Sequence, residues 1–417
     1  MVTDSRDNTH LGAGSIPVPP LGRDVHSWAP KHPAMYSRAE VERQTGSYES
    51  AVAPAIAEWS PTLDSETIAN VEQATLALRE FDLHSLTLFG TENPALAPMS
   101  AILLRTESAS SSQIEQLTTS AKQLALAELE EGQKHNAITV IGNVRAMEAA
   151  LRLSADLDGA AILAMHFELL SLHTGLHHEA GRYRSELVWI GNRDNAGPRG
   201  ATFIAPQHEL VPDAISDVVA FARRTDVPAL VQVAVAHAQF ETIHPFVDGN
   251  GRTGRAVVQA MLRNKGLSTH TTVPVSAGLL VDTESYFDAL SAYRSGDAGP
   301  IVRRFADASR YAAVTGRELV NNLAHQLQQS KDALTGVRSD SAAWRVLPLL
   351  IGQPVVNTRY LVGALGMNDM AVMRALQTLA ERGVLTERTG FSRNRVWEHR
   401  GILNVLDAYA DGIRRVR

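Results

Sequence analysis

Residues 244–255 read HPFVDGNGRTGR, and this stretch is the main basis for predicting how the chain is organised. Apolar residues at helical spacing precede it and follow it. Pro245 stops the first helix, and Gly249 and Gly251 allow backbone conformations that other residues avoid, which predicts a tight loop between two helices. The start of the second helix offers free backbone N–H groups and the positive end of the helix dipole, so the loop is expected to bind an anion.

The charged and titratable residues of this stretch suit a triphosphate. Arg252 and Arg255 are three residues apart, so they share one side of the second helix and can point toward the same polyphosphate. Asp248 is an acid beside that site, which makes sense if it holds a divalent cation such as Mg²⁺ that bridges the phosphates. His244 can take up a proton near neutral pH, which makes it the candidate general base for an attacking hydroxyl. Phe246 is predicted to anchor the loop in the core.

The composition is that of a cytoplasmic globular protein with two or three domains. The chain has 417 residues, of which 44% are hydrophobic and 20% charged. It contains no cysteine, which excludes disulfides and thiolate catalysis. The first residues lack the apolar segment of a signal peptide, and no later run approaches membrane-spanning length, so we expect no membrane contact. A net charge of −6 argues against binding of nucleic acid by the protein surface as a whole.

The pattern along the chain predicts a mainly α-helical fold with one β-hairpin. Apolar residues recur at three-to-four spacing from about residue 38 to 178, and again after a hairpin signal at 182–206. The expected divisions are a flexible leader (1–35), an N-terminal helical region (36–150), a helical-bundle core (151–312), a helical linker (313–338), a winged helix (339–400) and a C-terminal helix (401–417).

The last third of the chain has the order helix, helix, helix and two strands that is typical of a winged helix-turn-helix. Residues 368–382 would be the recognition helix, and Arg388, Arg393 and Arg395 in the wing could contact phosphates of DNA. The recognition helix carries acids and bases in similar number, and such modules also dock proteins or form dimers. DNA binding and a docking role therefore both stay open.

One other motif fits the loop but not its surroundings. Residues 249–254, GNGRTG, satisfy the G-x-G-x-x-G fingerprint of dinucleotide-binding folds. That fingerprint requires a strand before the glycines and an acidic residue about twenty positions later. A helical pattern precedes them here and no suitable acid follows, so the dinucleotide interpretation is rejected.

At every fixed position the loop resembles the signature of the Fic family, His-Pro-Phe-x-(Asp/Glu)-Gly-Asn-Gly-Arg-x-x-Arg. The resemblance implies a protein adenylyltransferase that uses ATP and Mg²⁺ or Mn²⁺ and is built as a helical bundle with a β-hairpin flap. It assigns the following roles: His244 deprotonates the target hydroxyl, Asp248 binds the metal, Asn250 and the amides of Gly249 and Gly251 hold the α-phosphate, Arg252 holds the inner phosphates and Arg255 the γ-phosphate.

Residues 189–206, WIGNRDNAGPRGATFIAP, are similar to the family's flap. By that resemblance the flap pairs with an extended segment of the target protein and places its hydroxyl before His244. Pairing of backbone groups aligns a target without demanding much of its sequence. An ordinary surface hairpin is the alternative. The residues expected to dock the target are Trp189, Ile190, Gly191, Gly200, Ala201, Thr202 and Phe203.

A helix at about 108–118 resembles the inhibitory helix that one class of the family carries before its core. The class pattern is Ser or Thr, three residues, Glu, then Gly or Asn. Ser111 and Glu115 match it, but Gln116 stands in the last position, which puts the termination of the helix in doubt. The resemblance implies that Glu115 pairs with Arg255 and displaces the γ-phosphate. A surface glutamate is the alternative.

Two function hypotheses follow. The first is an autoinhibited, Mg²⁺-dependent enzyme that transfers AMP from ATP to a Ser, Thr or Tyr hydroxyl of a target protein, including itself. The second is a DNA-binding transcription regulator that senses ATP and has little transferase activity. The residues fix neither the transferred base nor the target, and a homodimer is possible. His237 and Glu241, on the helix before the loop, are expected to pack or support the site rather than to react.

Overall fold

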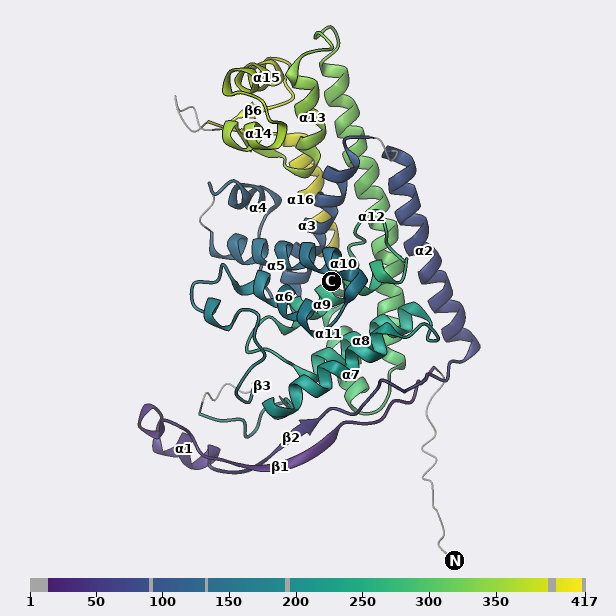
Figure 1. Ribbon diagram of the computed structural model, residues 1–417, viewed down its shortest axis with the longest axis vertical. Helices are drawn as coiled ribbons and strands as arrows, with labels where there is room; N and C mark the ends of the chain where they lie inside the picture. The colour runs from purple at the N-terminus through teal and green to yellow at the C-terminus, as the bar shows by residue number, and fades with distance from the viewer. Residues whose placement is uncertain (1–13, 90–92, 132–133, 192–195, 389–394, 415–417) are drawn as a thin grey trace, which may run out of the picture.

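In the computed structural model, the described residues are 14–89, 93–131, 134–191, 196–388 and 395–414. They form a mainly α-helical protein, which confirms the predicted fold class (Figure 1). Within these ranges, no helix is both long enough and apolar enough to cross a membrane.

A long two-stranded ribbon runs beneath the helical body (Figure 1). Its strands β1 (Gly22–Trp28) and β2 (Gly46–Val52) pair antiparallel along their whole length, and the 3-10 helix η1 (Pro33–Met35) and helix α1 (Arg38–Gln44) lie between them. Two expectations were wrong here. The leader 1–35 contains a regular strand, and the helical pattern read from residue 38 onward fails at 46–52. Pairing with a distant partner decided the conformation, which local apolar spacing does not reveal.

The helical body is built around α8 (Ala229–Ile243), in which every residue from 230 to 243 is buried. Helix α9 (Asn250–Asn264) leaves the loop after α8 and is almost as deeply buried. The apolar core surrounds both helices, so a polar side chain placed here is held by close packing. The other elements of the body are α2 (Ser65–Phe89), α3 (Leu96–Ile114), α4 (Ala121–Glu128), α5 (His135–Arg152), η2 (Ser154–Asp156), α6 (Gly159–Leu170), η3 (His177–Glu179), η4 (His208–Leu210), α7 (Val211–Arg223), α10 (Val275–Leu280) and α11 (Thr283–Arg294).

Helix α12 (Gly299–Ala333) is continuous for 35 residues. It packs along α2 and reaches from the body to the C-terminal elements (Figure 1). The expected boundary between core and linker at 312/313 therefore falls inside one helix. Buried residues continue on both sides of that boundary, from Ile301 to Leu327, so the packing does not change there.

The C-terminal elements are α13 (Ala342–Gly352), β5 (Val355–Asn357), α14 (Thr358–Leu365), α15 (Asp369–Glu381), β6 (Thr386–Glu387), β7 (Val396–Glu398) and α16 (Arg400–Arg414). The three strands form an antiparallel sheet in the order β5-β7-β6. Arg393 lies outside the described residues. Arg395 pairs with Glu387 and covers the ring of Trp397 at 4.9 Å, so it already has partners within the chain. The winged-helix assignment and DNA binding stay predictions.

Candidate active site

The predicted loop between two helices is present and has an unusual backbone. Helix α8 ends at His244, which adopts the left-handed conformation with φ 51° and ψ 62°. Helix α9 begins after Gly249, which has φ 78°. Phe246 is completely buried between these two points, as expected of a loop anchor. A histidine in the left-handed region costs free energy on the order of 1 kcal/mol or more, so the surrounding contacts must hold it there.

The imidazole of His244 is set up to accept a proton. Its Nδ1 lies 3.4 Å from the carbonyl oxygen of Glu241, and a proton on Nδ1 leaves Nε2 with a free lone pair. Burial is the main cause that lowers the pKa of His244 to about 4, and the positive charges of the nearby Arg294 and Arg184 also act to lower it. The ring is therefore neutral at pH 7, which is the form a general base needs.

Arg184 fixes the backbone of this loop, a role that no sequence pattern predicted. Its Nε donates to the carbonyl of His244 at 2.8 Å, and its two terminal nitrogens donate to the carbonyls of Glu186 at 2.9 Å and Pro206 at 2.6 Å. Burial lowers the pKa of Arg184 to about 10, so it remains charged at neutral pH. One guanidinium thus ties His244 to both ends of the hairpin that follows.

His166 holds the loop from the other side. Its Nδ1 accepts from the backbone N–H of Gly181 at 3.1 Å, which places its proton on Nε2, 3.1 Å from the carbonyl of Asp248. Its ring stacks on Phe246 with centroids 3.7 Å apart and planes 7° apart. His166 lies 82 residues from Asp248 in the chain, so no local pattern could have identified it.

Asn250 closes the loop with both ends of its side chain. Its Oδ1 accepts from the backbone N–H of Phe246 at 2.8 Å, and its Nδ2 donates back to the Phe246 carbonyl at 2.9 Å. Both polar ends of the side chain therefore stabilise the loop. The amide NH₂ group has a second N–H that these two bonds do not use, so the contact with the α-phosphate stays a prediction. Among the described residues, no side chain caps the N-terminus of α9, so its first backbone N–H groups remain available to an anion.

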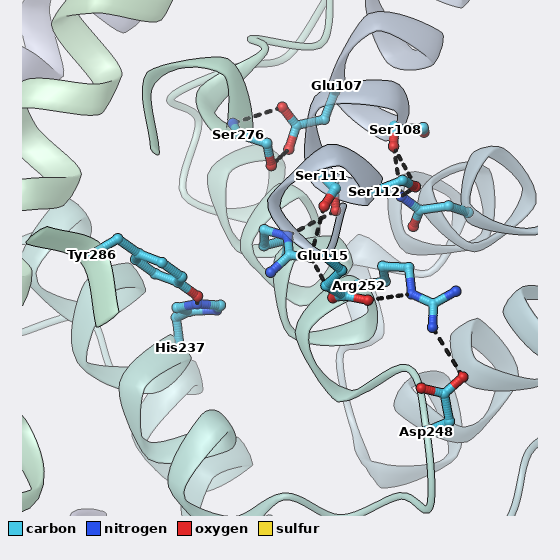
Figure 2. A network of polar contacts seen from close by, with 12 residues as sticks. Glu107, Ser108, Ser111, Ser112, Glu115, His237, Asp248, Arg252, Ser276 and Tyr286 are labelled. Atoms are coloured by element: carbon cyan, nitrogen blue, oxygen red, sulfur yellow. Dashed lines mark hydrogen bonds and ion pairs between the residues drawn. The ribbon is translucent and has the colours of Figure 1, made fainter. Parts of the chain in front are cut away.

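One carboxylate reaches both arginines of α9 (Figure 2). Glu115, at the end of α3, lies 2.7 Å from Arg255 through Oε1 and 2.8 Å from Arg252 Nε through Oε2. Arg255 also donates from Nε to the Ser111 hydroxyl at 2.8 Å and from Nη2 to the Ser111 carbonyl at 2.9 Å. Arg252 contacts Asp248 at 3.1 Å. The predicted pairing of Glu115 with Arg255 is present, and a second contact with Arg252 accompanies it.

The ion pairs lie in a largely water-excluded place. The side chains of Arg252 and Arg255 are each 3% exposed, whereas that of Glu115 is 30% exposed. Burial alone would lower the pKa of Arg255, but Glu115 and its other neighbours outweigh burial and raise it. The Nη1 atom of Arg252 is buried and has no hydrogen-bond partner among the described residues. An unused buried donor costs free energy, so this guanidinium is prepared for a further acceptor.

Helix α3 does terminate next to Glu115, although Gln116 replaces the expected Gly or Asn. The N–H of Leu117 donates to the Ser112 carbonyl at 3.0 Å, and the N–H of Gln116 donates to the Gln113 carbonyl at 2.9 Å. These are the two bonds of a Schellman motif, which requires a left-handed residue at the position of Gln116. Its φ is 64°. The termination that the sequence left in doubt is therefore made, with a residue poorly suited to it.

Behind Arg255 lies a buried polar group on α8 and α11. Nε2 of His237 lies 2.7 Å from the Tyr286 hydroxyl (Figure 2). Burial lowers the pKa of His237 to about 3 and raises that of Glu241 to about 7. Glu241 Oε1 is buried and has no partner among the described residues. Both side chains are buried, which fits their predicted role of packing or supporting the site.

The predicted flap is a short antiparallel pair, β3 (Trp189–Ile190) with β4 (Phe203–Ile204). Its central residues 192–195 lie outside the described residues. Gly191 and Gly200 have φ values of 82° and 83°, which glycine adopts without strain. The guanidinium of Arg294 lies 3.8 Å above the ring of Phe203. The remaining predicted docking residues, Ala201 and Thr202, follow Gly200 along the same segment.

The carboxylate of Asp248 suits a metal that arrives with phosphates. Its side chain is 42% exposed, at the open side of the loop. The described residues contain no group of three or more His, Asp or Glu side chains that could form a metal site alone. Mg²⁺ is commonly bound through one or two carboxylates together with the phosphates of a substrate, and a single aspartate fits that arrangement.

Comparison with known proteins gives a consistent family assignment. Residues 156–262 match the model of the Fic/DOC family. The chain is 30% identical over 187 residues to a protein adenylyltransferase of Caenorhabditis elegans, a match covering 42% of this chain and 32% of that protein. It is 41% identical over 69 residues to a probable protein adenylyltransferase of Aquifex aeolicus, covering 16% and 22%. The matches thus span a third or less of the length of these curated relatives.

Among solved structures, the protein is similar to a Fic family protein from Desulfovibrio desulfuricans G20. The TM-score is 0.49 with 24% sequence identity, and the match covers 81% of this chain and 97% of that one.

Proposed function

Since this chain is a member of the Fic family, we propose that it is a protein adenylyltransferase, an enzyme that transfers AMP from ATP to a Ser, Thr or Tyr hydroxyl of a protein. One arrangement carries the proposal. A neutral histidine ends α8 just before the uncapped N-terminus of α9, and the two arginines of α9 both contact Glu115. This places a proton acceptor next to a site for a polyphosphate.

ATP binds with its phosphates on the first N–H groups of α9. Arg252 contacts the inner phosphates and Arg255 the γ-phosphate, as the family resemblance implies. The buried Nη1 of Arg252, which has no partner in the described part of the chain, supports this assignment because a phosphate oxygen would satisfy it. Mg²⁺ held by Asp248 would neutralise phosphate charge.

The target hydroxyl gives its proton to Nε2 of His244 while its oxygen attacks the α-phosphorus. The bond between the α-phosphorus and the bridging oxygen breaks, and pyrophosphate leaves with the negative charge. The product is an AMP ester of the target, and the proton on His244 returns to solvent or to pyrophosphate. Arg184 contributes by holding the His244 carbonyl, so the ring is positioned before substrate binds.

Glu115 acts as a brake on this reaction. Its carboxylate occupies the two guanidinium groups that the triphosphate needs, and Ser111 further holds Arg255 in that pairing. Withdrawal of Glu115 would free both arginines together. The geometry supports stronger inhibition than a single ion pair would give, because ATP must compete at two contacts.

The decisive experiment measures AMP incorporation from labelled ATP into the purified protein and into a lysate. We expect Glu115→Gly to raise incorporation by about 10- to 100-fold, since a charge-assisted contact contributes roughly 1.5–3 kcal/mol. Glu72→Gly, at an exposed glutamate of α2, is the matched control and should leave incorporation unchanged. The proposal fails if Glu115→Gly binds Mg·ATP in calorimetry but transfers nothing to any protein.

A further inference from the structure

The N-terminal ribbon is fastened to the flap. Trp28 Nε1 donates to the Ala196 carbonyl at 2.9 Å, and the ring of Trp28 meets that of Trp189 edge-on with centroids 5.5 Å apart. Gln44 donates from Nε2 to the Arg199 carbonyl at 2.9 Å and accepts from the Arg199 N–H at 2.8 Å. The ribbon passes close to β3 at the edge of the body (Figure 1).

These contacts make the ribbon and the flap one structural unit. A two-stranded ribbon is marginally stable in isolation, so it depends on what it packs against. Gln44 is 1% exposed, and both ends of its amide are used by the flap segment. Ala51 of β2 is packed in an apolar cluster with Phe203 and Ala205. The ribbon therefore has a fixed place beside the flap.

One edge of β4 is open toward this ribbon. The N–H of Ala205 donates to the Val188 carbonyl at 3.1 Å, so Ala205 faces β3, and Phe203 does the same two residues earlier. Because alternate residues of a strand point their backbone groups to opposite sides, Thr202 and Ile204 face away from β3. Within the described ranges, neither residue makes a backbone hydrogen bond on that side.

A groove of about 320 Å³ lies between this open edge and β2. Thr202 and Ile204 form part of one wall, and Ser47 and Glu49 of β2 form part of the other. Glu49 pairs with Arg23 at 2.9 Å, and both side chains are mostly exposed. The groove thus combines free backbone groups on one wall with accessible charges of both signs on the other.

The groove is linked to the reacting histidine by two arginines. Arg184 donates to the carbonyls of both Pro206, just beyond β4, and His244. Arg294 covers Phe203 of β4 and donates to the Glu241 carbonyl at 3.2 Å. A chain segment held along β4 is therefore kept in a fixed relation to the imidazole.

We infer that the ribbon is the second wall of the target-binding groove. An extended segment of the target protein pairs its backbone with the open edge of β4, and its charged side chains contact the ribbon at Arg23 of β1 and Glu49 of β2. This inference rests on the proposed function and adds a determinant of target choice to it. Backbone pairing with β4 does not depend on the sequence of the target, whereas the ribbon selects targets by the charge of their side chains.

The test uses the Glu115→Gly protein as the parent and counts labelled AMP on proteins in a lysate of the cells that naturally contain this chain. Glu49→Arg and Ser47→Trp alter the β2 wall by charge and by bulk. We expect each to reduce labelling of lysate proteins at least tenfold. Mg·ATP affinity by calorimetry should stay unchanged, because neither residue touches the nucleotide site.

Asp24→Arg is the matched control, since it makes the same charge reversal on β1 outside the groove. It should leave labelling unchanged, and a loss equal to that of Glu49→Arg would overturn the inference. The double variant Arg23→Glu/Glu49→Arg restores the ion pair with the two charges exchanged. If this exchange restores full labelling, the charges act through the ribbon's own stability and the inference is wrong. Absence of labelling in the parent itself would instead contradict the proposed function.

Discussion

Helices α8 and α3 both end beside the site on a residue in the left-handed region, and the two ends differ in what that residue does. His244 has φ 51° and Gln116 has φ 64°. The His244 side chain is partly buried and is held by loop contacts, whereas Gln116 is exposed and adds only its backbone to the Schellman bonds. The strain at His244 therefore places a reactive group, while the strain at Gln116 serves no side-chain role and can be removed.

The largest expected effect comes from the end of α8. His244→Ala in the Glu115→Gly protein should reduce AMP transfer about 1,000-fold, since general base catalysis contributes 10²- to 10⁴-fold. Mg·ATP affinity should change little, because the phosphate site is on α9. The measurement is labelled AMP incorporation beside calorimetric binding. Retention of more than a tenth of the activity would mean that another group accepts the proton.

How far the sequence could predict this site depends on whether the partners are local. The loop that contains His244 and Asp248 and leads into Arg252 and Arg255 could be predicted, because a dozen consecutive positions contain both the turn and the charges. The two hydrogen bonds from the Asn250 side chain to Phe246 were missed, because residue type alone does not show that this side chain bonds within the motif.

Partners that are distant in the chain were harder to predict. Arg184 and His166 reach the loop from 60 and 82 residues away, and neither stands in a recognisable pattern. Glu115 was found through the family resemblance, but its contact with Arg252 depends on how the end of α3 is oriented. Strand β2 was missed because its residues pair with residues 18 to 30 positions earlier, from Gly46 with Trp28 to Val52 with Gly22, and its short apolar pattern also fits a helix.

Glu241 is buried in the last turn of α8 and should make stability depend on pH. Burial raises its pKa from 4.5 to about 7, so the folded protein binds more protons than the unfolded chain between these values. The contribution of Glu241 to the free energy of unfolding is therefore fully present below pH 4.5. It is lost as the pH rises through 7, and the loss is about 3 kcal/mol at most. Urea unfolding at pH 5 and pH 8 measures this loss.

In the same measurement, Glu241→Gln should flatten the difference between pH 5 and pH 8, because the amide is neutral throughout. Glu72→Gln, at an exposed position, should leave the difference as it is in the unmodified protein. An equal pH dependence in the Glu241→Gln variant would show that another buried group is responsible.

A smaller effect is expected from the contact that holds the end of α8. Arg184→Lys keeps the charge but cannot donate to three separate carbonyls in a fixed fork, so the backbone of His244 is less firmly placed. AMP transfer in the Glu115→Gly protein should fall about tenfold, on the order of one lost hydrogen bond to a charged group. The reduction should appear in kcat rather than in the affinity for Mg·ATP. A change confined to affinity would argue against a positioning role.

The smallest expected effect is at the end of α3. Gln116→Gly relieves the left-handed strain, partly offset by greater freedom of the unfolded chain, for a net gain of about 0.5–1 kcal/mol. The helix end that carries Glu115 becomes more stable, and AMP transfer by the otherwise unmodified protein should fall two- to fivefold. Gln113→Gly, three residues earlier in the same helix, should do the opposite because glycine weakens a helix interior. Changes of the same sign in both variants would disprove the argument.

The uninterrupted course of α12 has a consequence for whatever engages the C-terminal elements. At 1.5 Å per residue, its 35 residues span about 50 Å without a proline or a break in the interior. A continuous helix of this length fixes the distance between the elements at its two ends. A target protein bound near α13 would be held at a fixed distance and orientation relative to the imidazole of His244. Its distance from the site, as much as its affinity, would then decide which of its hydroxyls can be modified.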